Sequence, residues 1–500
     1  MASFTVTNLL DFGTGSLRQA ILDANGLGGT DEIFFDSGLS GGTINLTSGE
    51  LLITDDLTIN GLGADFFSVD AGGSSRVFNI DDGDDDNFLD VLLDGLTITG
   101  GSSGESAEGS GIFNAENLTL TNSIVSGNSS FDDVGGIFNS GELTVTNSII
   151  SDNYSFDDAS GISNSGELTV TNSIISNNES FFGIGGIKNS GELTVTNSSI
   201  NANFGANIGG ISNSGELTVN NSTISGNFSR GIGGISNSGE LTVTNSTISD
   251  NNGYFDTGGI SNSGELILTN STISGNFSQG PAGIFNLGEA SVTNSTISDN
   301  DSKYGGSIRN SGELTVTNGT ISGNYSYYSS SITNDIDSLA TISNSIIAGN
   351  TTFIDNNTSA DVAGDFTSNG FNLIGDITGS TGFENDLTFA SLGGISIADV
   401  LDTNLTNNGG FTLTHALIAG SPAIDAGNNN DISALTDQRG VGFERIVDGN
   451  NDTIAVVDIG AFEVQQQSTA VPETSSMLGL LGLVIVASGS ILRRKLKRKL

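Results

Sequence analysis

The strongest constraint on this chain is a sequence unit that recurs along its middle with a period of 24 or 25 residues. The unit reads GGI-x-NSGELTVTNSTISGN, and its first Asn falls at positions 114, 139, 164, 189, 213, 237, 262, 286, 310 and 334. The period changes only between the third Asn of a copy and the next Ile, so we expect a loop there. Repetition of this kind predicts a solenoid in which each copy packs against its two neighbours.

Apolar and polar residues alternate within each copy, which is the period of a β-strand with one face inward. A leucine-rich repeat has a similar length, but its pattern L-x-x-L-x-L-x-x-N does not fit this alternation. Short strands and Gly-containing turns instead predict an all-β fold, a single-stranded right-handed parallel β-helix whose coils pair about 4.8 Å apart. In one copy the predicted inward residues are Ile137, Asn139, Leu143, Val145, Asn147, Ile149 and Asn153.

Asn occupies three of these inward positions, and we predict that each position forms a ladder of amide hydrogen bonds along the solenoid. A buried Asn without a partner would cost about 1–3 kcal/mol, and repetition in every coil removes that cost. In two neighbouring copies the predicted ladder residues are Asn139, Asn147, Asn153, Asn164, Asn172 and Asn178. The many N-x-S/T sequences, such as the one at Asn245, are therefore interpreted as buried positions rather than glycosylation sites.

An open β-helix exposes strand edges at its ends, so we expect caps there. Ser16 and Gln19 have the spacing of a capping box. We predict an N-terminal helix that plugs the first coil with one apolar face, formed by Leu17, Ala20, Ile21 and Ala24. The stretch FTVTNLLDFGTGSLRQAILDAN resembles the N-terminal segment of many bacterial β-helix surface proteins, through its Ser-Leu-Arg-Gln-Ala-Ile motif.

The composition excludes several kinds of site. With 57 acidic and 14 basic residues, the formal net charge is −43, which argues against a nucleic-acid partner because no basic surface can neutralise phosphates. The chain has no Cys, which excludes disulfides and Cys–zinc sites, and its one histidine excludes a multi-His metal site. That histidine, His415, has no nucleophile motif nearby, and we expect it to have a structural role.

Two columns of residues are expected on the surface of the coils. The first is acidic, and we interpret it as a solvated face, with cation binding as the alternative: Glu142, Glu167, Glu192, Glu216, Glu240, Glu265, Glu289 and Glu313. The second follows the third Asn of each copy and is aromatic. Its rings could stack on sugars or could fold inward and seal a corner of the helix. The candidate glycan contacts are Phe204, Phe228, Phe277, Tyr304 and Tyr325.

Two acidic stretches offer oxygen ligands for Ca²⁺, the one cofactor that the residue pattern suggests. In the first, oxygen-bearing residues alternate as in a Ca²⁺ loop, although the full EF-hand pattern is absent. Its candidate ligands are Asp448, Asn450, Asp452 and Asp458. The second is a denser run formed by Asp81, Asp82, Asp84, Asp85 and Asp86. For both stretches the alternative is a solvated loop.

The C-terminal end combines an apolar run with a basic tail. Residues 477–492 carry no formal charge, which predicts a transmembrane helix over 475–492 that anchors the chain in a membrane. Lys and Arg make up most of residues 493–500, which predicts a basic cytoplasmic end. Before the apolar run stand Val471, Pro472 and Glu473, with Thr474 next.

This order resembles the PEP-CTERM sorting signal of exported bacterial proteins, in which a Pro-Glu-Pro element precedes a membrane helix and an Arg-rich end. Here Thr474 replaces the second proline, and Arg493, Arg494 and Lys495 begin the basic end. The resemblance implies an exosortase-type partner that removes the tail at the membrane. Because residues 1–7 lack the basic start and apolar stretch of a signal peptide, we expect an upstream start or another export route.

Towards the C-terminus, residues 421–427, 436–440 and 458–463 resemble the choice-of-anchor domain that accompanies many β-helices. We therefore divide the chain into seven segments. They are a cap with the first coils (1–60), irregular coils with an acidic insertion (61–111), regular repeats (112–350), C-terminal coils with the anchor-like region (351–465), a linker with the sorting motif (466–474), the transmembrane helix (475–492) and the basic tail (493–500).

Pectate lyases and polygalacturonases share the β-helix and use Ca²⁺ with a basic residue, or clustered Asp, to cleave polysaccharides. In residues 112–324 no copy breaks the consensus with a cluster of acids. We therefore expect a non-catalytic surface or extracellular-matrix protein, adhesive or structural and associated with polysaccharide. We expect it in the cell envelope, or secreted after C-terminal processing. The alternative is a polysaccharide lyase or glycoside hydrolase with its site in residues 60–110 or 351–460.

Overall fold

Each repeat folds into one coil of the chain that contains four short strands. In one coil these are β15 (Ile137–Asn139), β16 (Glu142–Thr146), β17 (Ile149–Ser151) and β18 (Tyr154–Ser155). The computed structural model describes residues 1–84, 87–103, 108–353, 360–432 and 434–466. They include one structural unit, Met1–Val464, and the first residues of a second, Gln465–Leu500.

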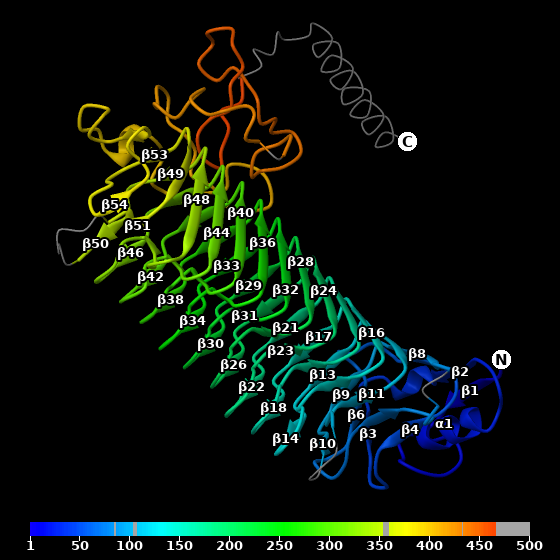
Figure 1. Cartoon of the computed structure of the whole chain (residues 1–500). Coiled ribbons are helices and arrows are strands. Elements are labelled where there is room, and N and C mark those ends of the chain that lie inside the picture. Colours follow the sequence, from blue (N-terminus) through cyan, green and yellow to red (C-terminus); the bar gives the residue numbers. More distant parts are fainter. Residues whose placement is uncertain (85–86, 104–107, 354–359, 433, 467–500) are drawn as a thin grey trace, which may run out of the picture. The chain divides into compact units, whose positions relative to one another are not determined.

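Equivalent strands of successive coils pair in parallel and in register, which builds four long sheets along the solenoid (Figure 1). Within the described residues, sheet I holds 14 strands, from β4 (Leu51–Ile53) through β15 to β54 (Ser380–Thr381). Sheet II holds 15, from β1 (Ser3–Val6) through β16 to β52 (Thr367–Gly370). Sheet III also holds 15, from β3 (Thr43–Asn45) through β17 to β55 (Leu387–Thr388).

Sheet IV is the narrowest, because each of its strands has two residues. Its strands are β10 (Ser102–Ser103), β14 (Ser129–Ser130), β18, β22 (Glu179–Ser180), β26 (Phe204–Gly205), β30 (Phe228–Ser229), β34 (Asn252–Gly253), β38 (Phe277–Ser278), β42 (Asp301–Ser302), β46 (Tyr325–Ser326) and β50 (Thr351–Thr352). The loops of variable length predicted from the sequence follow these strands.

The core is a column of aliphatic side chains inside the coils. Ile137, Leu143, Val145 and Ile150 are fully buried, and their equivalents repeat in the neighbouring coils. The predicted alternation does not run unbroken, because Asn147 has a φ of 50° and turns the chain between β16 and β17. Asn tolerates this left-handed conformation better than most residues do. The turn exchanges the two faces of the following strand, so that the residues of that strand point to the opposite side from the one that strict alternation predicts. Ile150 therefore points inward, and the prediction of Ile149 as a core residue is wrong.

Two of the three predicted Asn ladders are confirmed. The Nδ2 of Asn139 donates to the Oδ1 of Asn164 at 2.7 Å. The Nδ2 of Asn153 donates to the Oδ1 of Asn178 at 3.0 Å, and the same bonds recur from coil to coil. Each buried amide thus has a donor on one side and an acceptor on the other.

The third ladder is made of Ser rather than Asn. Asn147 and Asn172 are exposed residues of the left-handed turn, and their predicted inward position is wrong. Asn245 occupies the same turn and is half-buried. The following Ser takes the inward place: the backbone N–H of Ser148 donates to the Oγ of Ser173 at 3.0 Å.

The Asn153 ladder ends on a carboxylate. The backbone N–H and the Nδ2 of Asn350 both donate to the Oδ1 of Asp361, at 3.1 and 2.9 Å. A ladder in which every amide donates forward needs an acceptor at its last step, and a carboxyl group supplies one. Burial raises the pKa of Asp361 to about 6.

The N-terminal cap is α1 (Leu17–Asn25), which packs on β1, β2 (Asp31–Phe35) and β4. The predicted apolar face is confirmed, because Leu17, Ala20, Ile21 and Ala24 are the buried residues of the helix. The capping box is half formed. Ser16 Oγ accepts from the N–H of Gln19 at 3.2 Å, but the Gln19 side chain donates to Asp23. A short 3₁₀ helix, η1 (Ser37–Leu39), follows β2.

Beyond η2 (Ile397–Asp399) the chain leaves the coils and runs back along sheet III, as the orange segment of Figure 1 shows. Three Thr residues, each the first residue of its strand, hold this segment. Thr272 of β37 (Thr272–Ser274) donates to the carbonyl of Leu413 at 2.7 Å. Thr296 of β41 (Thr296–Ser298) donates to Gln438 Oε1 at 2.6 Å. Thr320 of β45 (Thr320–Ser322) accepts from the N–H of Ala461 at 2.9 Å.

Several sequence predictions concern residues outside the described ranges. They are the sorting motif at Val471, Pro472 and Glu473, the helix over 475–492, and the basic end that starts with Arg493, Arg494 and Lys495. Asp85 and Asp86 also lie outside them. Within the described residues, no helix is long and apolar enough to cross a membrane.

Candidate functional site

The aromatic face of the solenoid is formed by sheet IV and the loops that follow its strands. Phe204, Phe228, Phe277 and Tyr325 begin β26, β30, β38 and β46, and Tyr304 lies in the loop after β42. Phe228, Phe277, Tyr304 and Tyr325 are 40%, 37%, 52% and 36% exposed, and Phe204 is half-buried. The interpretation that these rings fold inward to seal a corner is therefore wrong. They lie at the surface.

Many rings of the aromatic face stack on one another from coil to coil. The centroids of Phe131 and Phe156 lie 4.7 Å apart with planes 7° from parallel, and those of Phe156 and Phe181 lie 5.2 Å apart at 1°. A second stack joins Tyr304 to Tyr328 at 5.1 Å and 3°. A ring inside such a stack has both faces covered and presents its edge to solvent. A ligand ring can therefore stack only where a column of aromatic residues ends.

The column of Phe131, Phe156 and Phe181 has no further ring stacked on Phe181, and Phe182 lies beside it. The ring of Phe182 stands at 89° to that of Phe181, and it lines a surface depression of about 550 Å³ together with Asn207, Arg230 and Asp256. Arg230 is exposed and makes no ion pair with any residue that the structure describes. Sequence reasoning counted Phe182 only as one member of the aromatic column, and it named none of Asn207, Arg230 and Asp256 as a site residue. The available signal was the change of period near residue 204.

The predicted glutamate column is confirmed as a structural feature. Glu142 begins β16 and pairs in register with Glu167, which pairs with Glu192, and the row continues to Glu313. These side chains are exposed on sheet II. The column therefore lies on the surface, as the interpretation of a solvated face requires.

The structure does not gather the candidate Ca²⁺ ligands near the C-terminus around one point. Asp448 accepts from the N–H groups of Asp452 and Thr453, and Asn450 accepts from the N–H of Asp452, so these side chains close local turns. Asp458 is fully buried, and its two oxygens accept from the N–H groups of Asp425 and Val464 at 2.7 Å each.

The acidic run near residue 81 does form a cluster. Asp81 and Asp82 place carboxylate oxygens within 4.8 Å of Glu116, a residue that the sequence pattern did not single out. Glu116 is 2% exposed and accepts from the N–H groups of Leu89 and Asp82. Burial, with added repulsion from Asp82 and Asp81, raises the pKa of Glu116. These hydrogen bonds tie the acidic insertion to the coil.

His415 has the expected structural place. Its Nε2 lies 2.8 Å from Ser298 Oγ, and its Nδ1 lies 2.8 Å from the carbonyl oxygen of Asp402. Ser298 is 0% and His415 2% exposed, so a substrate cannot reach this Ser–His pair. Burial lowers the pKa of His415, which favours the neutral ring. The histidine fastens the C-terminal segment to β41.

The anchor-like motif supplies a buried ionic core for that segment. Arg439 donates from Nη2 to Asp437 at 2.6 Å, and its guanidinium lies between the rings of Phe443 and Phe462 at 3.9 and 3.7 Å. Arg445 is 1% exposed and lies 3.8 Å from Glu463. Burial raises the pKa of Glu463 to about 9. A pKa of about 9 keeps the Glu463 carboxyl protonated at neutral pH, so the ionic contact of this core is the pair Arg439–Asp437. Burial keeps all of these side chains from a ligand.

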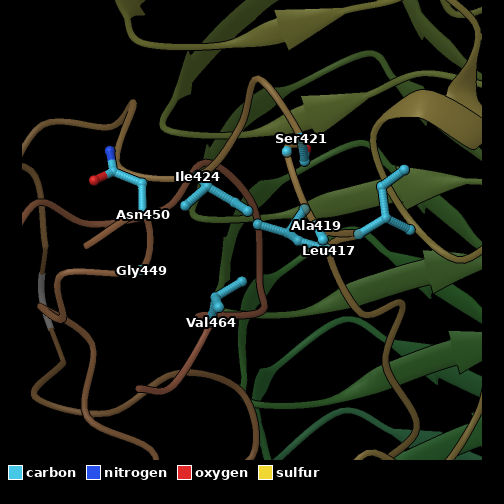
Figure 2. Close-up of a pocket in the computed structure, with 9 residues that line it drawn as sticks. Leu417, Ala419, Ser421, Ile424, Gly449, Asn450 and Val464 are labelled. Carbon is cyan, nitrogen blue, oxygen red and sulfur yellow. The ribbon is translucent and has the colours of Figure 1, made fainter. Parts of the chain in front are cut away.

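A larger cavity, of about 650 Å³, lies in the same segment (Figure 2). Its lining is mainly aliphatic, with Leu417, Ile424 and Val464 around it. Asn450 belongs to the lining, but its side chain points away from the aliphatic residues in Figure 2. No titratable side chain lines this cavity among the residues described, so it offers no chemistry beyond apolar contact.

Comparison with known families identifies the fold. A family model described as "Right handed beta helix region" matches residues 44–248, which includes most of the first regular coils. The chain is a right-handed parallel β-helix. No curated protein matches it significantly in sequence.

Several solved β-helix structures are similar to this chain at low scores. Pectate lyase Pel9A is 14% identical, with a TM-score of 0.32, covering 93% of this chain and 96% of its own. The A-module of the Azotobacter vinelandii mannuronan C-5 epimerase AlgE4 is 13% identical, with a TM-score of 0.35, and the alignment covers 76% of this chain and 99% of the A-module. A tailspike protein mutant of E. coli bacteriophage HK620, in complex with a pentasaccharide, is 12% identical, with a TM-score of 0.32, covering 74% of both chains. These scores assign no activity to the β-helix.

Proposed function

We propose that this β-helix is a non-catalytic protein of the cell surface or extracellular matrix that binds polysaccharide through its aromatic face. The observation that carries the proposal is the exposure of aromatic residues in successive coils of sheet IV and its loops. Monomeric proteins rarely expose apolar side chains in contiguous rows, and such rows mark interaction surfaces. An extended, repetitive ligand suits an extended, repetitive surface.

A row of rings favours sugars over a protein partner for a further reason. The face is interleaved with hydroxyl and amide side chains, such as Ser129 and Asn252 at equivalent positions of sheet IV. Sugars present apolar C–H faces and polar hydroxyl rims, so a mixed surface of rings, amides and hydroxyls matches both. Export by the PEP-CTERM-type signal, with release by an exosortase-type enzyme, would bring this face into contact with extracellular polysaccharide.

The binding proposal is tested by replacing Phe228 and Phe277 with Ser. Ile174 and Ile267 are the matched controls, because they are 41% and 40% exposed, against 40% and 37% for the two Phe, but lie on sheets III and II. Retention of the full-length protein on immobilised polysaccharides should fall for the Phe variant and stay unchanged for the Ile→Ser pair. Equal retention of both variants would contradict a role for the aromatic face.

The location is tested separately by fractionating cells that express the full-length protein from its own genomic locus. We expect the protein in the envelope or the medium, with its apolar tail removed in the released form. Recovery of the intact protein from the cytosolic fraction would contradict export.

The alternative function is a polysaccharide lyase or glycoside hydrolase, and one observation favours it. Asp81 and Asp82 of the irregular coils form a carboxylate cluster with Glu116 of the first regular repeat, and Asp82 is exposed at this cluster. Incubation with acidic and neutral polysaccharides, followed by assays for unsaturated products and new reducing ends, tests this alternative. Product formed by the unaltered protein and lost in Asp82→Asn would replace the non-catalytic proposal.

A further inference from the structure

A depression interrupts the aromatic face at the point where the loop length changes. The loops between the third Asn and the next Ile have eight residues at 179–186 and at 252–259, but seven at 204–210 and at 228–234. Two short loops thus lie between two long ones. The residues around the depression come from all four loops: Phe182 and Asp256 from the long loops, and Asn207 and Arg230 from the short ones.

The short loop also ends the stack of rings. In the next coil Ala206 takes the position of Phe181, so no ring continues the column, and Asn207 takes the position of Phe182. The N–H of Asn207 donates to the carbonyl of Gly183 at 3.2 Å, and its Nδ2 donates to the carbonyl of Phe182 at 2.5 Å. Phe182 is 49% exposed and perpendicular to Phe181. It stands at 90° to Phe156 as well, so its ring lies beside the stacked column and lines the depression instead of being enclosed between two other rings.

The polar groups of the depression keep bonding capacity for a ligand, although Asn207 donates to Phe182 and Asp256 accepts from Thr257 Oγ1 at 3.2 Å. The guanidinium of Arg230 makes no ion pair or side-chain hydrogen bond in the described residues, whereas Lys188, on a strand of sheet I, pairs with Asp158 at 2.8 Å. Arg230 brings N–H donors and Asp256 brings acceptors, and their formal charges cancel. Adjacent hydroxyls on a sugar ring act as donor and acceptor together and fit such a pair.

Resting on the proposed function, we infer that this depression is a binding site for a neutral hexose or pentose polysaccharide. One sugar ring stacks on Phe182, and the neighbouring hydroxyls bond to Arg230, Asp256 and Asn207. A volume of about 550 Å³ lies within the range of roughly 300–1,000 Å³ typical of small-molecule sites. A uronate polymer would face a chain with net charge −43, and one guanidinium does not offset that repulsion.

The test uses the full-length protein on an array of neutral polysaccharides (β-glucan, mannan, xylan) and uronate polymers (alginate, polygalacturonate). We expect binding to at least one neutral polymer, weakened tenfold or more by Phe182→Ser and by Arg230→Ala. The matched controls are Phe34→Ser, an exposed ring on β2 of sheet II, and Lys303→Ala, an exposed cation that does not line the depression. Both controls should bind as the unaltered protein does.

A loop graft closes the site without removing either group. Residues 179–186 replace residues 204–210, which restores eight residues and continues the column of rings over Phe182. We expect the graft to abolish neutral-polysaccharide binding at an unchanged melting temperature.

The possible results distinguish an error in the inferred binding site from an error in the proposed polysaccharide-binding function. If polysaccharide binds but Phe182→Ser, Arg230→Ala and the graft bind as tightly as the unaltered protein, or if only uronate polymers bind, the inferred site is wrong and the proposed function stands. If no polysaccharide on the array binds, both are wrong.

Discussion

The assignment of two kinds of Asn in each coil makes a direct prediction about stability. Asn197 and Asn203 lie in the same coil, six residues apart, and the sequence pattern does not distinguish them. In the structure Asn203 is 1% exposed and belongs to the ladder, whereas Asn197 is an exposed turn residue with a φ of 50°. We expect Asn203→Ala to destabilise the protein strongly and Asn197→Gly to leave it almost unchanged.

The magnitude follows from the bonds that Asn203 makes. Its Oδ1 accepts from both the N–H and the Nδ2 of Asn178, at 3.1 and 3.0 Å, and its Nδ2 donates to the carbonyl of Ile175 and to Asn227. Removal of the side chain leaves two buried donors of Asn178 without an acceptor. At about 1–3 kcal/mol for each, the free energy of unfolding should fall by about 4 kcal/mol. Asn197→Gly should change it by less than about 0.5 kcal/mol, because Gly adopts a positive φ readily.

Urea denaturation followed by far-ultraviolet circular dichroism measures the two changes, with native-state hydrogen exchange as the local readout. In Asn203→Ala, exchange should accelerate at the backbone N–H of Asn178 and in the two adjoining coils. If the two variants differ by less than about 1 kcal/mol, the ladder bonds contribute no net stability and the reasoning fails.

Three further predictions follow from single residues. Ala202 has a φ of 53°, so Ala202→Gly should raise the free energy of unfolding by about 1 kcal/mol in thermal melts, whereas Ala206→Gly, outside the left-handed region, should lower it. The pKa of Asp361 is raised to about 6 from 3.8, so the folded state holds a proton that the unfolded state loses, and stability falls as pH rises from about 4 to 6. In Asp361→Asn, the difference in unfolding free energy between pH 4 and pH 8 should shrink by about 3 kcal/mol, and an unchanged difference would refute the assignment. Arg439→Lys loses the paired bonds to Asp437, so hydrogen exchange should accelerate in residues 400–464 and stay unchanged in the coils, at a cost of about 3 kcal/mol.

The sequence predicts the parallel β-helix and two of its ladders because the same residue type recurs at each inward position in up to ten copies of the unit. It predicts the helical cap from the spacing of apolar residues. It does not reveal the left-handed turn at Asn147, because that position holds Asn in neighbouring copies just as a ladder does. Each regular coil has a second left-handed turn, directly before the Asn of the Asn153 ladder, and this turn could have been predicted. Its positions hold Gly127, Asp152, Asn177 and Gly226, and exchange among Gly, Asp and Asn is typical of a positive φ.

The path of the C-terminal segment could not be predicted for a different reason. Its contacts join residues far apart in sequence, such as Thr296 and Gln438, and no local pattern encodes such a pair. Thr also occupies the position of Thr296 in coils that the segment does not contact, for example at Thr223. Composition likewise showed an acidic run near Asp81 but gave no sign that Glu116, more than 30 residues later, would join it.

The aromatic face shows why regularity and binding conflict in a solenoid. A ring repeated at one position of every coil meets its own copy one coil away, and the centroid spacings of 4.7 and 5.2 Å between Phe131, Phe156 and Phe181 are close to ideal for stacking. Perfect repetition therefore turns ring faces into a stabilising column and leaves only edges for a ligand. A face becomes available where the repeat is broken, and a loop one residue shorter is enough to break it. Sites in such a chain should thus be sought at changes of period rather than at changes of consensus, and here the change between residues 179–186 and 204–210 leads to Phe182 and Arg230.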